Sequence, residues 1–122
     1  MKPANMAGRR ILVVEDEPLI AMEIENVLLS LGCTVVGPTG SLRTALELAT
    51  VEVLDGAILD VSIRGLEVYP VADVLLGRGV EFILASGYTD WALPLRFRNR
   101  SRLTKPYDYA TLVQMLLTLQ KS

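Results

Sequence analysis

Apolar residues recur along this chain in two alternating patterns, short continuous runs and longer stripes with helical spacing. The short runs cover residues 11–14, 34–36, 57–59, 82–85 and 103–104, and their length suits buried strands. Stripes with apolar residues three or four positions apart follow the first, second, third and fifth runs. Strands that alternate with helices predict a parallel α/β sheet, in which each helix carries the chain back across one face.

Residues that begin or end regular structure stand at the borders of these patterns. Ser41 and Asp108 can each cap the first turn of a helix with a side-chain oxygen. The strand at 34–36 is expected to close at the Gly37-Pro38 turn. These signals separate the strands from the helices that follow them.

The stretch 88–101 fits neither pattern. Its apolar residues alternate with polar ones, and Pro94 interrupts them. Four arginines at alternate positions surround Phe97 and form a basic run: Arg96, Arg98, Arg100 and Arg102. We expect a solvated segment with few fixed contacts. Nucleic-acid binding is disfavoured, because the chain is slightly acidic and lacks a recognisable binding module.

Length and composition fit a single domain. The chain has 122 residues and a net charge of −2, which favours neither nucleic acid nor anionic membrane. We expect a loose tail over residues 1–8 and one domain over 9–122, with no output domain. Mean hydropathy is high, at +0.38, yet no apolar stretch approaches the roughly 18 residues of a membrane span. A sheet buried on both faces explains this, and we expect a cytoplasmic protein.

Polar residues follow four of the predicted strands. Glu15 and Asp16 follow the first, and Asp60, Ser86 and Lys105 follow the strands at 57–59, 82–85 and 103–104. Because the carboxyl ends of parallel strands meet at one edge, these side chains should lie together. Three adjacent carboxylates call for a divalent cation and the lysine. We interpret the edge as a place where a phosphoryl group is received, with Asp60 as the nucleophile that forms an acyl phosphate.

The acid pair Glu15-Asp16, Asp60, Ser86 and the Lys105-Pro106 pair stand in the order typical of one family. On these residues the chain resembles a receiver domain of two-component response regulators, over nearly its full length. The resemblance implies a doubly wound, five-stranded parallel sheet of the flavodoxin-like (βα)5 type, with strand order 2-1-3-4-5. It also implies a cis peptide before Pro106. The phosphoryl donor would be a histidine kinase, and the signal would pass to an unidentified downstream protein. A monomer or weak dimer is expected.

The resemblance also assigns roles within the site. Asp16 and Asp60 would bind Mg²⁺ directly, Glu15 would hold it through water, and the backbone carbonyl of Ser62 would complete the protein ligands. Lys105 would pair with the phosphoryl group, and the Ser86 hydroxyl would take another of its oxygens.

Two features depart from the common receiver pattern. Arg102 stands where receivers usually carry the aromatic residue that switches on activation. The run 82–88, Phe-Ile-Leu-Ala-Ser-Gly-Tyr, resembles the Phe-Ala-Thr-Gly-Tyr motif of a single-domain receiver subgroup found mainly in alphaproteobacteria. Ser86 replaces the threonine of that motif and keeps its oxygen. Tyr88 is either a substitute switch or partner contact, or a packed surface aromatic.

Without the usual aromatic, we expect activation to act mainly on residues 87–100. The segment would become ordered, and Tyr88 or Trp91 would change environment.

Three alternatives stay open at this stage. A phosphate sink would accept and hydrolyse phosphate to drain a kinase without an effector. An aspartate-nucleophile phosphatase is disfavoured, because residues 60–64, Asp-Val-Ser-Ile-Arg, lack the second acid of the Asp-x-Asp motif. A flavin-binding module is disfavoured by the acidic loop after the first strand. We therefore expect a signalling protein with slow self-dephosphorylation rather than an enzyme.

Overall fold

The computed structural model describes residues 6–87 and 93–119 of the chain. In this part of the chain, five parallel strands form one sheet in the order β2-β1-β3-β6-β7. The elements follow one another as β1 (Arg10–Val14), α1 (Pro18–Ser30), β2 (Thr34–Thr39), α2 (Leu42–Val51), β3 (Gly56–Asp60), β4 (Ser62–Ile63), β5 (Leu66–Glu67), α3 (Tyr69–Gly77), β6 (Phe82–Ser86), the 3₁₀ turn η2 (Leu95–Phe97), β7 (Ser101–Thr104) and α4 (Tyr109–Leu117). Counting only the strands of this sheet, the order is 2-1-3-4-5, which confirms the predicted receiver topology.

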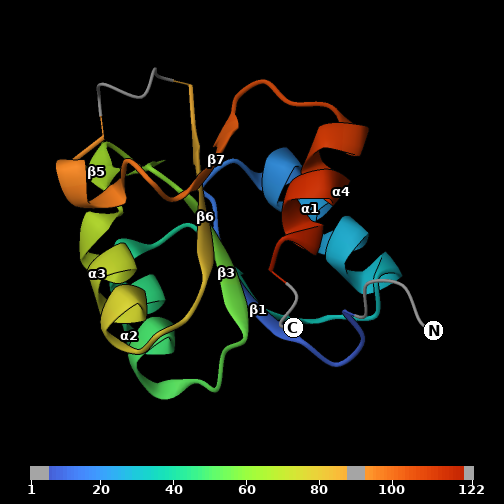
Figure 1. Ribbon diagram of the computed structural model, residues 1–122, viewed down its shortest axis with the longest axis horizontal. Coiled ribbons are helices and arrows are strands. Elements are labelled where there is room, and N and C mark those ends of the chain that lie inside the picture. Colours follow the sequence, from blue (N-terminus) through green and yellow to red (C-terminus); the bar gives the residue numbers. More distant parts are fainter. Residues whose placement is uncertain (1–5, 88–92, 120–122) are drawn as a thin grey trace.

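Helices cover both faces of the sheet. Helices α1 and α4 lie on one side and α2 and α3 on the other (Figure 1). Alternate residues of β1 enter the two cores: Leu12 and Val14 pack with α2 and α3, while Ile11 and Val13 pack with α1 and α4. Such double-sided burial explains why the strands read as continuous apolar runs.

Strand β2 is longer than predicted. It continues through Gly37 and Pro38 to Thr39, and its register against β1 shifts between Leu12 and Val14. Gly37 has a φ of +97°, and a Cβ there would stand 3.0 Å from the Val13 carbonyl oxygen. The turn signal therefore marks an irregularity within a strand, and the predicted end of the strand was wrong.

The segment 93–100 is anchored, which corrects the expectation of few fixed contacts for this part of residues 87–100. Phe97 in η2 is fully buried and stacks on Tyr69 with ring centroids 5.4 Å apart. Arg96 donates two hydrogen bonds to Asp73, at 2.9 and 3.0 Å. Nonlocal packing of this kind leaves no periodic signal in the sequence. The predictions for Tyr88 and Trp91 lie outside the described residues.

The predicted loose tail does not extend over residues 6–8. The Met6 side chain is 2% exposed and packs in the core beside α1. The Gly8 N–H donates to the Gly32 carbonyl at 2.8 Å. A buried apolar side chain and a backbone hydrogen bond hold these residues on the domain, although the sequence around them has no periodicity. Among the described residues, no helix has the length and apolar character needed to cross a membrane.

Candidate functional site

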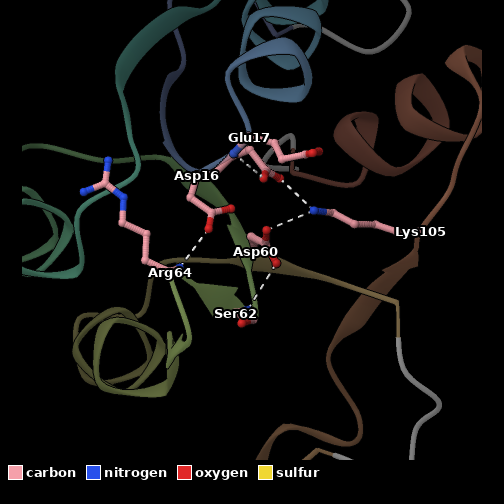
Figure 2. Close-up of polar contacts among 7 residues, drawn as sticks. Asp16, Glu17, Asp60, Ser62, Arg64 and Lys105 are labelled. Atoms are coloured by element: carbon pink, nitrogen blue, oxygen red, sulfur yellow. Dashed lines mark hydrogen bonds and ion pairs between the residues drawn. The ribbon is translucent and has the colours of Figure 1, made fainter.

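The carboxyl ends of β1, β3 and β7 bring three acids and a lysine together, and we call Glu15, Asp16, Asp60 and Lys105 the acid site. Figure 2 labels Asp16, Asp60 and Lys105 among them. The Lys105 ammonium donates to Asp60 Oδ2 at 2.9 Å and to Glu15 Oε1 at 3.0 Å. Glu15, Asp16 and Asp60 each offer a carboxylate oxygen within 4.8 Å of the others. The strand-end argument therefore placed these four side chains correctly.

The acid site is strongly charged for its degree of burial. The Glu15 and Asp60 residues are only 4% and 8% exposed. Burial raises the pKa of Glu15 to about 7, and the neighbouring Asp60 adds to the rise. The hydrogen bond from the Glu17 N–H and the contact with Lys105 oppose it. A single ammonium does not compensate three carboxylates, so the site favours a further cation.

Lys105 is held in its charged form by its two partners. Burial by itself lowers the pKa of Lys105, but the hydrogen bonds to Asp60 and Glu15 outweigh it, so that the pKa is raised. Lys105 is therefore a fixed positive charge at the acid site at physiological pH.

Backbone N–H groups orient the three carboxylates. Each carboxylate accepts one such bond: Glu17 N–H to Glu15 Oε2 at 3.0 Å, Arg64 N–H to Asp16 Oδ2 at 2.8 Å, and Ser62 N–H to Asp60 Oδ1 at 3.1 Å. Charge-assisted bonds of this kind restrict rotation of the carboxyl groups. The remaining oxygens of Glu15 and Asp60 accept from Lys105.

Sequence reasoning missed the small β4–β5 hairpin that supplies two of these donors, the Ser62 and Arg64 N–H groups. The two strands pair antiparallel, and Arg64 and Gly65 form the turn between them, with φ values of +50° and +81°. Positive φ at both positions defines a tight hairpin turn in which Asn-Gly or Asp-Gly is usual. Arg-Gly is a weak signal for it, and two-residue strands have no detectable periodicity. The hairpin thus donates to both aspartates, through the Ser62 N–H to Asp60 and through the Arg64 N–H to Asp16.

The acid site suits a hard divalent cation. Carboxylate oxygens are the ligands that Mg²⁺ uses in proteins, and Mg²⁺ is commonly held by one or two carboxylates with water completing the shell. The clustered carboxylate oxygens match this donor chemistry. Exposed Ser62, two residues past Asp60, adds a backbone carbonyl in the adjoining segment.

Comparison with known proteins shows which family shares this fold. No family model matches the chain. The chain is 40% identical to SdrG from Sphingomonas melonis Fr1; the match to its solution structure covers 92% of this chain and 96% of SdrG, with a TM-score of 0.79. The response regulator REC domain of PhyR from Erythrobacter litoralis is 26% identical, covering 96% of this chain and 95% of that domain, with a TM-score of 0.81. This chain belongs to the response regulator receiver domains.

Two further matches extend the comparison of this receiver. A BeF3-activated conformation of SdrG is 41% identical over 93% of this chain and 98% of that one, with a TM-score of 0.76. The transcriptional regulatory protein PdtaR of Mycobacterium tuberculosis is 28% identical over 109 residues, which are 86% of this chain and 53% of PdtaR. The receiver therefore spans about half the length of this curated relative.

Two other residues singled out from the sequence, Ser86 and Arg102, lie on β6 and β7. Ser86 ends β6, and its carbonyl oxygen accepts from the Lys105 N–H at 2.9 Å. Its neighbour Ala85 pairs with Asp60 in the sheet. Arg102 lies on β7 opposite Leu84 and is half-buried. The peptide between Lys105 and Pro106 is cis, as the resemblance implied.

Proposed function

We propose that this receiver accepts a phosphoryl group from a histidine kinase on Asp60 and passes the signal to a downstream protein by direct contact. The observation that carries the proposal is the environment of the Asp60 carboxylate. It lies 2.9 Å from the Lys105 ammonium and within the same 4.8 Å cluster as Glu15 and Asp16. Phosphoryl transfer needs this combination, because two anions must approach each other.

The transfer is a displacement at phosphorus. A carboxylate oxygen of Asp60 attacks the phosphoryl group, the bond from phosphorus to the donor nitrogen breaks, and the product is an aspartyl phosphate. Lys105, already 2.9 Å from Asp60, neutralises part of the charge on the incoming group. Ser86 would offer its hydroxyl to another phosphoryl oxygen from the end of β6.

Mg²⁺ is the cofactor that the acid site suits. We assign Asp16 and Asp60 as direct ligands, Glu15 as a ligand through water and the Ser62 carbonyl as the remaining protein ligand. The clustered carboxylates and their backbone donors support this assignment. When bound, the metal supplies positive charge that offsets the repulsion between carboxylate and phosphoryl oxygens.

Membership of the receiver family supports a proposal for the wider role. We propose that this chain acts as a cytoplasmic receiver, a monomer or weak dimer with slow self-dephosphorylation. The phosphate sink differs only after the transfer, because it has no effector. Affinity measurements against the partner proteins with and without beryllofluoride distinguish the two roles: a signalling receiver gains affinity for an effector, and a sink does not.

Incubation with acetyl phosphate and Mg²⁺, followed by intact mass measurement, tests the acceptor role. We expect one added phosphoryl group in the wild type and none in Asp60→Asn. Asp73→Asn is a matched control, because Asp73 lies on α3 and bonds Arg96 rather than Lys105. Labelling of Asp60→Asn at the wild-type rate contradicts the proposal.

A further inference from the structure

Tyr107 lies next to the acid site with a buried hydroxyl. It lines a pocket of about 390 Å³ together with Lys105, Pro106 and two residues of α1, Ile20 and Glu23. The Tyr107 hydroxyl oxygen is inaccessible to solvent, and it has no hydrogen-bond partner within residues 6–87 and 93–119. The pocket thus adjoins the acid site through Lys105, and Tyr107, which carries the unused hydrogen-bond donor, forms part of its wall.

An unused buried hydroxyl needs an explanation. Leaving a buried donor unsatisfied costs the desolvation of that group, whereas a phenylalanine of nearly the same shape avoids this cost. Burial raises the pKa of Tyr107 to about 12, and the negative charge of Glu15 is the next contribution. The hydroxyl is therefore a protonated donor. Tyr107 lines the same pocket as Lys105, and Lys105 is bonded to Glu15.

We infer that Tyr107 is a positioning residue of the phosphorylated receiver, in which its hydroxyl donates a hydrogen bond to the Glu15 carboxylate. This inference rests on the proposed function. In the resting structure Lys105 is shared between Glu15 and Asp60. A phosphoryl group on Asp60 brings about two negative charges to that side of the lysine. The Lys105 ammonium then moves toward the phosphoryl group, and Glu15 loses its ion pair with Lys105.

Glu15 then keeps the Glu17 N–H on Oε2 but loses the Lys105 ammonium from Oε1, and its side chain is only 1% exposed. A buried carboxylate that loses its cation is costly unless another donor replaces it. Tyr107 follows Lys105 by two residues and holds such a donor. The pocket beside it gives the ring room to move. The resting cost of the hydroxyl is then offset by the bond that it makes in the activated state.

The test compares Tyr107→Phe with Tyr109→Phe. Tyr109 begins α4 and is 60% exposed, so its hydroxyl serves as a matched control. We expect Tyr107→Phe to keep or raise the melting temperature of the resting protein and to weaken beryllofluoride binding in Mg²⁺ at least threefold. Amide chemical shifts would follow the titration. Tyr109→Phe should leave both quantities unchanged. Loss of a hydroxyl with only a packing role would not weaken beryllofluoride binding without also lowering the melting temperature.

Glu15→Leu identifies the acceptor, because leucine removes both carboxylate oxygens whereas glutamine would keep an accepting oxygen. If Glu15 receives the bond, the threefold effect of Tyr107→Phe on beryllofluoride affinity should disappear in the Glu15→Leu background. Equal affinities of wild type and Tyr107→Phe, or a lowered melting temperature of Tyr107→Phe, overturn the inference. An undiminished effect in the Glu15→Leu background also overturns it. A wild type that binds no beryllofluoride contradicts the proposed function itself, which separates the two failures.

Discussion

The acid site and the segment 93–100 are held in place by different forces. In the acid site, buried Glu15 and Asp60 share the Lys105 ammonium, and uncompensated negative charge is left beside them. In the segment 93–100, Phe97 is fully buried against Tyr69 and Phe82, and the flanking arginines stay near the surface. The first region should therefore respond to cations and pH, while the second should respond to loss of apolar contact.

The largest effect should follow from removing the apolar anchor. Phe97→Ala deletes a ring that is 0% exposed and stacks on Tyr69, so the free energy of unfolding should fall by about 3–5 kcal/mol. Urea unfolding measures the change. Leu95→Ala, two residues away and 79% exposed, is the control and should cost about 0.5 kcal/mol or less. Similar losses in the two variants would show that the segment is not anchored.

Mg²⁺ should stabilise the acid site without affecting the anchor. We expect the free energy of unfolding to rise by about 1–3 kcal/mol at ten to a hundred times the dissociation constant. Thermal melting in EDTA and in millimolar Mg²⁺ measures it. Asp16→Asn should abolish the increase and can raise the stability of the metal-free protein by relieving repulsion. An unchanged melting temperature of the wild type would rule out the cation site.

The pH dependence of stability should come from Glu15. Its pKa is raised from 4.5 to about 7 in the folded protein, chiefly by burial. Between these values the folded state binds more protons than the unfolded chain, so stability falls as pH rises and levels off above about 7. We expect a loss of about 3 kcal/mol across this window without metal, since each pKa unit corresponds to about 1.4 kcal/mol. Chemical unfolding at several pH values measures it against Glu15→Gln, which should lack this component. Identical pH profiles of the two proteins would contradict the assignment.

The smallest effect is expected at Arg102. Arg102 lies on β7, three residues before Lys105, and is paired with Leu84 of β6 in the sheet. Arg102→Tyr restores the aromatic that receivers usually carry there. Because Arg102 is outside the acid site, the rate of acetyl phosphate labelling should stay within about threefold of the wild type. A much larger fall in that rate would show that Arg102 takes part in the acceptor site.

The same contrast explains what could be predicted from the sequence. Glu15, Asp60 and Lys105 each follow an apolar run, and parallel strands must bring their carboxyl ends to one edge. The strand pattern was therefore enough to predict that these side chains lie together. The order of the strands in the sheet was predicted from the resemblance to receiver domains. The cap at Ser41 was also confirmed, since its hydroxyl accepts from the Thr44 N–H at 3.2 Å.

Contacts that depend on side-chain packing between distant elements could not be predicted from the sequence. Phe97 meets Tyr69 across 28 positions of sequence, and the alternating arginines around Phe97 suggested a solvated segment instead. Met6 is buried although its neighbours form no pattern. The position of the Tyr107 hydroxyl depends on how α1 packs beside the segment after β7. No local rule predicts such contacts, because they form only when distant elements meet.

The most direct test of the central claim locates the phosphoryl group on the chain. After labelling with acetyl phosphate and Mg²⁺, borohydride converts an aspartyl phosphate to homoserine, and peptide mass spectrometry finds the converted residue. The account predicts conversion at Asp60 alone, because Asp60 lies both in the carboxylate cluster and 2.9 Å from the Lys105 ammonium. Conversion at Asp16 or elsewhere, with Asp60 intact, would contradict it.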